Sequence, residues 1–294
     1  MKKKFDIINK LFLLDIPIEC NDSYNFLPFY SDKNMEDITI NFIKKDNIHE
    51  KLENQLYDLG NIKIYKTTEG IVREHIDYKS KMPFALFFEE PDEVNKYKCF
   101  LYPGFEKKIY NISNVFELIG IESILYKNNT FILHSSYIKY KNEAILFSGP
   151  SGSGKSTQAQ LWEKYEHAEI INGDRTAIND NNGKWEAYGL PYAGSSNIYK
   201  NITTVIKSIV VIRQGKDNKI KRLNEAEAFK LIYSETTINI WNKDFVNKIC
   251  NIILKMIKEI PIYLFYCTDD VRAVEVLKNK IERDTIYESD KSGI

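Results

Sequence analysis

The sequence predicts an α/β protein in which a smaller β-rich domain, residues 1–112, precedes a larger α/β domain, residues 113–294. Short segments of the first domain alternate apolar and polar residues, which is typical of strands joined by polar turns. From about residue 130 onward, strand patterns alternate with helix patterns, which indicates an α/β sheet. A glycine-rich loop between an apolar strand and a helix, at residues 145–162, adds to this prediction.

Strands account for most of the N-terminal domain. The segments with strand patterns are residues 37–43, 61–78, 82–90 and 97–104. The second of these contains a turn at Glu69 and Gly70, which predicts a pair of strands. Residues 114–129 differ, because their apolar side chains recur at helical spacing, and they are expected to form one helix.

The C-terminal domain begins with a hairpin. Residues 130–149 predict a strand, a turn at Lys141 and Asn142, and a second strand that leads into the glycine-rich loop. Further strands are expected at residues 168–173, 204–214 and 261–268. Helices are expected at residues 156–165, 223–241, 243–260 and 269–283.

The composition excludes several classes of protein. The 294 residues carry 41 basic and 41 acidic side chains, so the chain lacks the basic excess on which general nucleic-acid binding depends. The 4 cysteines form no C-x-x-C pair, which argues against a zinc site and a disulfide framework. No stretch approaches the roughly 20 apolar residues of a membrane span. We expect a cytoplasmic protein without nucleic-acid or membrane partners, and homo-oligomerisation is left open.

The glycine-rich loop carries the strongest functional signal. Residues 149–156, with the sequence GPSGSGKS, match the phosphate-binding pattern G-x-x-x-x-G-K-[ST] in full. The glycines let backbone N–H groups approach phosphate oxygens, and the following helix directs its positive end at the same anion. Lys155 is expected to reach the β and γ phosphates of ATP, and the Ser156 hydroxyl to ligate Mg²⁺. The expected nucleotide contacts are Gly149, Ser151, Gly152, Ser153, Gly154, Lys155, Ser156 and Thr157.

Two titratable residues lie near the loop in sequence. Asp174 follows a short apolar strand, where it would lie near the metal if that strand neighbours the loop strand; an ordinary turn residue is the alternative. His134 lies near the end of the strand that precedes the loop strand. A single histidine in such a place has either a structural or an active-site role.

His134, the loop GPSGSGKST and the segment NGDR together resemble the HPr kinase/phosphorylase family, relatives of the nucleotide-dependent phosphoenolpyruvate carboxykinases. That family has a histidine, a strand hairpin, a loop of this type, a helix, and a strand ending in Asp-Asp-Arg. The segment RLNEAEAF is similar to one in related small kinases. The resemblance covers roughly residues 130–235 and implies a P-loop kinase domain of this type. Residues 1–110 do not resemble the family's usual N-terminal domain.

The resemblance implies a kinase that transfers phosphate from Mg²⁺-ATP to a hydroxyl, usually a serine of a protein or peptide. Some shorter relatives modify ribosomally made peptides such as lasso peptides. The catalytic residues that it implies are His134, Lys155, Asp174 and Arg175, with Ser156 and Asp174 on the metal. HPr itself is not the expected acceptor, because the family's second signature loop has no close match here. A carboxykinase is disfavoured, since the chain is short and lacks that family's other metal-binding elements.

One position departs from the family pattern. Gly173 stands where the family has its first aspartate, to which proton removal from the acceptor is assigned. A base contributes about 10²–10⁴-fold to such a reaction, so its loss slows a kinase without abolishing transfer. Arg175 and Arg213 are candidates for stabilising the transferred phosphate. The segment 188–198 either offers N–H and hydroxyl groups to a phosphate or acceptor or forms a plain turn.

Three functions therefore stay open at the level of sequence. The first is a kinase that acts on a protein or peptide hydroxyl. The second is a nucleotide-binding regulator without turnover, and the third is a kinase for a small molecule. The sequence does not identify the acceptor.

Overall fold

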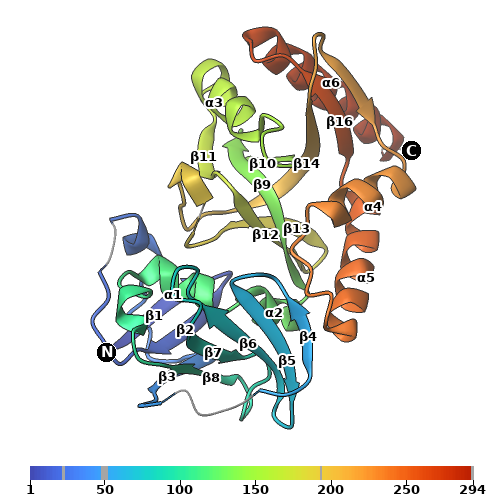
Figure 1. Ribbon diagram of the computed structural model, residues 1–294. Coiled ribbons are helices and arrows are strands. Elements are labelled where there is room, and N and C mark those ends of the chain that lie inside the picture. The colour runs from blue at the N-terminus through green and yellow to red at the C-terminus, as the bar shows by residue number, and fades with distance from the viewer. Residues whose placement is uncertain (22–23, 48–51, 193, 293–294) are drawn as a thin grey trace. The chain divides into compact units, whose positions relative to one another are not determined.

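The computed structural model describes residues 1–21, 24–47, 52–192 and 194–292. The chain divides into two compact units, each with its own sheet, which confirms the coarse prediction of a mixed α/β protein (Figure 1). Unit 1 contains residues 1–128 and 239–245, and unit 2 contains residues 129–238 and 246–294. Unit 1 thus extends past the boundary expected after residue 112 and takes in a short segment from the second half of the chain.

Unit 1 is built on an eight-stranded sheet with the order β1-β2-β3-β8-β7-β6-β5-β4. Strand β3 pairs in parallel with β2 and β8, and the other neighbours are antiparallel. The β5–β6 pair is the hairpin expected around Glu69 and Gly70. The strands are β1 (Lys2–Ile7), β2 (Lys10–Asp15), β3 (Ile38–Lys44), β4 (Gln55–Asp58), β5 (Ile62–Thr67), β6 (Gly70–Ile76), β7 (Pro83–Phe88) and β8 (Lys96–Leu101).

The helices of unit 1 are short. The single helix expected over residues 114–129 is wrong, because the chain breaks at Gly120, which has a left-handed φ of 51°. A Cβ on Gly120 would lie 2.5 Å from the guanidinium carbon of Arg73, so a side chain there would displace a buried cation. Apolar spacing alone does not reveal such a break. The elements are η1 (Tyr24–Phe29), η2 (Phe105–Lys107), α1 (Ile112–Leu118), α2 (Glu122–Leu125) and η3 (Tyr126–Asn128).

Unit 2 contains the second sheet, with the order β10-β9-β12-β13-β14-β16-β15, and β11 pairs with β9. Because β10 also pairs with β14, strands β9, β12, β13, β14 and β10 close a ring of pairings. The β9–β10 turn lies at Lys141 and Asn142, as predicted, and their φ values of 47° and 65° fit a tight hairpin. The strands are β9 (Thr130–Tyr140), β10 (Glu143–Ser148), β11 (Glu169–Asn172), β12 (Arg175–Asn181), β13 (Lys184–Gly189), β14 (Thr203–Gln214), β15 (Lys219–Arg222) and β16 (Ile262–Cys267).

Three parallel strands determine where a ligand site forms in unit 2. Strand β14 pairs in parallel with β10 and with β16, so the carboxyl ends of all three meet at one edge of the sheet. The middle of β14, Ile209–Ile212, is fully buried, which explains its continuous apolar sequence. In α/β folds, in open sheets and in barrels alike, ligands bind at the carboxyl ends of the parallel strands.

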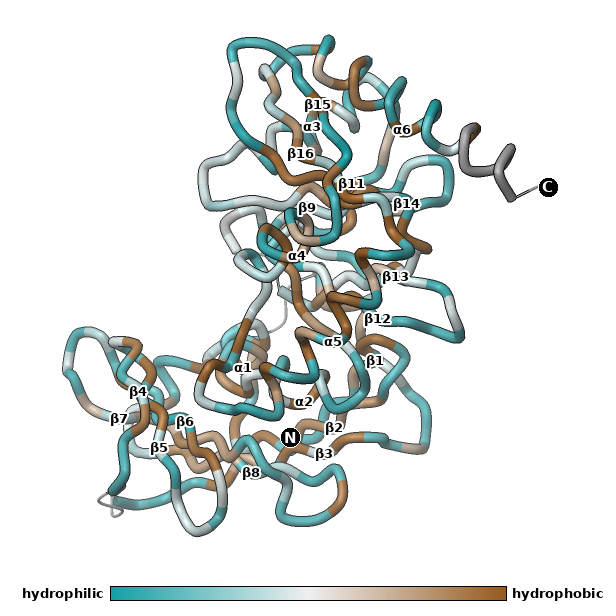
Figure 2. Tube along the Cα trace, turned by 90° about the vertical axis from the view of Figure 1, so that its right-hand side faces the viewer, coloured by the Kyte–Doolittle hydropathy of each residue, from teal (hydrophilic) through white to brown (hydrophobic). Residues whose placement is uncertain are grey.

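The helices of the second half of the chain are α3 (Lys155–Glu166), α4 (Glu225–Ser234), α5 (Lys243–Glu259) and α6 (Val271–Ser292), with the 3₁₀ turn η4 (Gly194–Ser196). Helices α3 and α6 pack on this sheet. Trp162 of α3 and Leu277 of α6 share a buried cluster with Phe147, Val210 and Phe265 of the strands. Figure 2 shows hydrophobic residues recurring along strands and helices, whereas connecting loops are largely hydrophilic. Within the described residues, no helix combines the length and apolar character needed to cross a membrane.

Candidate functional site

The glycine-rich loop lies where the sequence predicted it, between β10 and α3. Gly149 begins the loop with a φ of 140°, and a Cβ there would lie 2.9 Å from the Ile212 carbonyl oxygen and from Ser153 Oγ. Only glycine fits such a position without displacing β14. The loop is therefore folded tightly against the carboxyl end of the neighbouring strand.

The loop presents polar groups that the protein does not satisfy. Helix α3 begins after Gly154, which has a left-handed conformation and supplies no side-chain cap to the first N–H groups. Ser153 Oγ is buried and lacks a hydrogen-bond partner. Such a set of donors at the start of a helix suits an anion with several oxygen acceptors.

Lys155 is folded back onto the loop. Its Nζ donates to the carbonyl oxygens of Gly149, at 2.7 Å, and Pro150, at 3.1 Å. Burial lowers the pKa of the Lys155 ammonium, while the carboxylates of Glu235 and Asp174 act in the opposite direction. The Lys155 ammonium therefore already lies over the loop. The loop also contains the predicted nucleotide contacts Ser151 and Gly152. The two remaining contacts, Ser156 and Thr157, are exposed at the start of α3.

A cavity of about 370 Å³ adjoins the loop. It is bordered by the start of α3 and by the residues that follow β14 and β16, at the sheet edge described above. Gln158 borders it and donates from Nε2 to the Thr268 carbonyl oxygen at 2.9 Å, while Gln158 Oε1 lacks a partner. The space has the size and place expected for part of a nucleotide next to a phosphate-binding loop.

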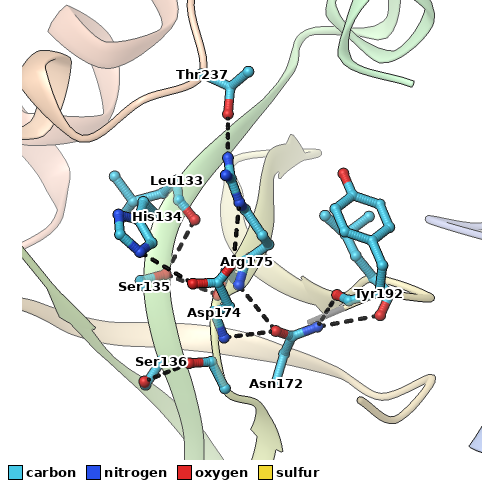
Figure 3. Close-up of polar contacts among 12 residues, drawn as sticks. Leu133, His134, Ser135, Ser136, Asn172, Asp174, Arg175, Tyr192 and Thr237 are labelled. Atoms are coloured by element: carbon cyan, nitrogen blue, oxygen red, sulfur yellow. Dashed lines mark hydrogen bonds and ion pairs between the residues drawn. The ribbon is translucent and has the colours of Figure 1, made fainter. Parts of the chain in front are cut away.

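A second group of polar residues forms around Asp174 (Figure 3). His134 Nε2 lies 3.1 Å from Asp174 Oδ1, and Arg175 Nε lies 3.3 Å from Asp174 Oδ2. The hydrogen bond from His134, helped by the charge of Arg175, lowers the pKa of the Asp174 carboxyl, so Asp174 is a carboxylate at neutral pH. The side chains of His134 and Asp174 are 25% and 27% exposed, so a ligand can reach both.

Asn172 fixes the turn that carries Asp174. Its Oδ1 accepts from the N–H groups of Asp174 and Arg175, at 3.0 and 2.9 Å, and its Nδ2 donates to the carbonyl oxygens of Leu190 and Tyr192 (Figure 3). The sequence analysis missed Asn172. The dipeptide Asn-Gly before an aspartate was the available signal, because asparagine commonly bonds to the backbone two residues on.

The segment after α4 supplies two further residues that sequence reasoning missed. The helix expected over residues 223–241 ends at Ser234, and Glu235–Thr237 then run beside β9. Glu235 Oε2 lies 3.6 Å from His134 Nδ1, and Thr237 Oγ1 accepts from Arg175 at 2.9 Å. Nothing in the helical pattern marks these residues, since their position depends on a contact with a distant strand.

Strand pairing connects the Asp174 group to the loop. Ser148, the last residue of β10, is paired with Ser135 of β9, and its hydroxyl donates to the His134 carbonyl oxygen at 3.0 Å. On the other side of β9, the Ser135 N–H donates to the Asp174 carbonyl oxygen at 3.0 Å. Since neighbouring strands lie about 4.8 Å apart, Asp174 and the loop are about 10 Å apart across β9. Arg213, the second arginine expected to stabilise the transferred phosphate, lies beside Gly149 at the end of β14.

The turn η4 lies against Asp174. A Cβ on Gly194 would come within 3.0 Å of the Asp174 carboxylate, so this turn adjoins the site. A Cβ on Gly173 would lie 2.4 Å from Ser196 Cβ, so the present turn leaves no room for a side chain there. The present conformation of this turn therefore favours glycine at position 173. Residue 193 and the side chain of Ser195 lie outside the described part of the chain.

The residues fit a nucleotide with its magnesium ion, and they do not form a metal site of their own. The described residues contain no group of three or more His, Cys, Asp or Glu side chains arranged to hold a metal. Mg²⁺ normally binds through one or two protein oxygens together with phosphate oxygens and water. The ionised Asp174 and the exposed Ser156 hydroxyl agree with that pattern.

No protein-family model and no curated protein matches the chain. Among solved structures, the chain is similar to one described as the structure of the Hpr(Ser) kinase/phosphatase from Coxiella burnetii. The sequence identity is 10%, the match covers 55% of this chain and 94% of that chain, and the TM-score is 0.31. This likeness is distant, and the function proposed below rests on the residues of this chain.

Proposed function

We propose that the protein is an ATP-dependent phosphotransferase that moves the γ-phosphate of ATP to a hydroxyl group. The observation that carries this proposal is the joint placement of a G-x-x-x-x-G-K-S loop and an accessible His134–Asp174 pair on neighbouring strands. A loop that only bound Mg²⁺-nucleotide could use the carboxylate of Asp174 for the metal, but it would not require a histidine paired with that carboxylate. The acceptor best supported by the sequence resemblance is a serine of a protein or peptide.

The nucleotide binds along the loop in this proposal. Backbone N–H groups at the start of α3 hold phosphate oxygens, and Lys155 exchanges its bonds to the loop carbonyls for bonds to the β and γ phosphates. The cavity beside Gln158 receives the nucleoside. Ser156 and Asp174 would hold Mg²⁺, which neutralises charge on the phosphate oxygens when it is bound.

The transfer step then uses residues of the Asp174 group. In the structure without ligands, His134 Nε2 donates to Asp174, so the acceptor must first displace this hydrogen bond while the neutral ring keeps its proton on Nδ1. The O–H bond of the acceptor then breaks, and its proton passes to Nε2 of His134. The acceptor oxygen forms a bond with the γ-phosphorus as the bond to the bridging oxygen breaks, and ADP leaves. Arg175 forms an ion pair with Asp174, and its side chain is 37% exposed. Its guanidinium stabilises negative charge on the transferred phosphate. Carboxylates on both sides of His134 stabilise the imidazolium that results.

A nucleotide-binding regulator without turnover is the second candidate. The observation that favours it is Gly173, because this position has no carboxylate and no room for one. A regulator would keep the loop and the response to ATP, and it would lack transfer. A kinase for a small molecule differs from the first proposal only in the acceptor.

One experiment separates these functions. The protein is incubated with ATP labelled at the γ-phosphate, Mg²⁺, a library of serine-, threonine- and tyrosine-containing peptides, and a set of free hydroxyl metabolites. We expect label in serine peptides, dependent on Mg²⁺. Label confined to one metabolite would assign the small-molecule kinase, and tight ATP binding without any labelled product would assign the regulator.

A further inference from the structure

We infer that a cavity in unit 1 binds a small zwitterionic ligand, of which a free amino acid is the simplest example. The cavity has a volume of about 560 Å³, within the range of small-molecule sites. Its wall is formed by the β5–β6 hairpin, the residues that follow β7, the short helices α2 and η3, and the segment 241–244. All of these belong to unit 1, so the inference does not depend on the function proposed for unit 2.

The buried part of the cavity wall is held by bonds within the protein. The Glu89 side chain accepts from Arg73 and from the Trp241 indole N–H, the latter at 3.1 Å. Arg73 also lies over the Trp241 ring, 5.3 Å from its centre. The buried Ser123 hydroxyl donates to the Gly120 carbonyl oxygen at 2.8 Å. Because these groups are already paired, they maintain the shape of the cavity and leave ligand recognition to the exposed part of its wall.

The exposed part of the wall carries charges of both signs. Lys66 and Lys243 supply ammonium groups, and Glu90 and Asp244 supply carboxylates. Within the described part of the chain, none of these four side chains takes part in a hydrogen bond or an ion pair. Lys127, a third cation of the wall, already donates to a tyrosine hydroxyl at 3.2 Å. The cavity therefore offers two cations and two carboxylates that are not paired with one another.

Two aromatic side chains, Tyr126 and Trp241, complete the wall. Burial raises the pKa of the Tyr126 hydroxyl, and the carboxylates of Asp244 and Glu90 act in the same direction. These two carboxylates therefore lie close enough to the Tyr126 ring to act on it electrostatically. Carboxylates beside an aromatic ring suit an ammonium group, which is attracted both by the negative charge and by the face of the ring.

The balance of charges selects one class of ligand. A polyanion would meet the carboxylates of Glu90 and Asp244, and a simple cation would lie beside the ammonium groups of Lys66 and Lys243. Each of these ligands leaves two charges of the wall repelled or unpaired. A molecule with one ammonium and one carboxylate group provides a partner for both pairs. The amino acids are the smallest common metabolites of this kind.

The first test varies the ligand. The full chain is titrated in a calorimeter with each of the common protein amino acids. Every amino acid that binds is then compared with its N-acetyl derivative, which lacks the ammonium, and with its amide, which lacks the carboxylate. We expect at least one amino acid to bind, and both of its derivatives to bind about 10-fold more weakly or worse, because each loses a charged partner. Absence of binding by every amino acid, or equal binding by either derivative, would overturn the inference.

The second test varies the wall of the cavity. One variant combines Glu90→Gln with Asp244→Asn, and another combines Lys66→Met with Lys243→Met. All four side chains are exposed, so both variants are expected to fold, which a wild-type melting temperature would verify.

We expect each double variant to bind the amino acid about 10-fold more weakly or worse than the wild type. The matched controls are Glu53→Gln and Lys79→Met, which change exposed charges of unit 1 outside the cavity wall and should leave the affinity unchanged. Wild-type affinity in either double variant would place the ligand elsewhere and overturn the inference.

Discussion

Unit 1 and unit 2 each contain a group of cationic side chains and carboxylates. The two groups differ in how deeply they are buried and in how fully their hydrogen-bonding atoms are paired. In unit 1, the Arg73 guanidinium lies 2.5 Å from Glu89 and 2.7 Å from Glu122, and its side chain is only 7% exposed. The Trp241 indole N–H donates to Glu89 at 3.1 Å, and Asn239 completes the group when its amide donates to Glu122 and accepts from Arg73.

In unit 2, by contrast, His134, Asp174 and Arg175 keep about a quarter or more of their side-chain surface exposed. The Asp174 carboxylate is reachable by a ligand, and the loop beside it has a buried hydroxyl without a partner. The comparison teaches that ion pairs alone do not identify a functional site. A saturated, buried group such as that of Arg73 maintains the fold, whereas a partly exposed group with spare bonding capacity can act on a ligand.

The largest expected effect is on transfer. His134→Ala removes the proton acceptor, and we expect single-turnover transfer from labelled ATP to fall by about 10²–10⁴-fold. Binding of Mg²⁺-ATP should persist, because the loop and Lys155 are unchanged. His167→Ala is the control, since His167 is an exposed residue at the end of α3. A wild-type rate of transfer in His134→Ala would remove His134 from the mechanism.

The next effect compares the two arginines directly. Arg73→Met leaves Glu89 and Glu122 buried without their cation, and we expect the free energy of unfolding to fall by about 3–5 kcal/mol. Arg175→Met removes a half-exposed cation, and we expect a loss of about 1 kcal/mol or less, together with slower phosphate transfer. Urea denaturation and the transfer assay measure both quantities. Equal losses of stability in the two variants would contradict the division into a structural and a functional group.

A smaller effect is the pH dependence of stability that His75, a buried histidine near Arg73, produces. Burial, helped by the charge of Arg73, lowers the pKa of the His75 imidazole from 6.5 to about 3. Below about pH 6.5 the unfolded chain binds a proton at His75 that the folded chain does not bind. The free energy of unfolding therefore decreases by about 1.4 kcal/mol for each unit by which the pH is lowered. Above pH 6.5 this histidine contributes no pH dependence.

The measurement for His75 is urea denaturation at pH 7, 6 and 5. His75→Gln should flatten the fall in unfolding free energy over this range, and the exposed His167→Gln should leave it unchanged. Parallel pH profiles in His75→Gln and the wild type would show that His75 is not kept neutral by burial.

The sequence predicted the parts of the site that depend on local pattern. The loop at residues 149–156, the hairpin turn at Lys141 and Asn142, and the strand before Asp174 were all expected and are present. Residues placed by distant contacts were not predicted. Glu235 was expected within a long helix, yet α4 ends at Ser234 because the following residues bond to β9. The burial of Arg73 likewise depends on the break at Gly120, which no periodic pattern reveals.

The central claim is that the loop of unit 2 binds the phosphates of ATP through Lys155. The most direct measurement is calorimetric titration of Mg²⁺-ATP into the wild type, Lys155→Ala and Lys164→Ala, the last being an exposed lysine of the same helix. Loss of a charged hydrogen-bond donor costs about 1.5–3 kcal/mol, so we predict that Lys155→Ala weakens binding by about 10–150-fold. Lys164→Ala should bind as the wild type does. Equal affinity in Lys155→Ala and the wild type, or no binding to the wild type, would contradict the account.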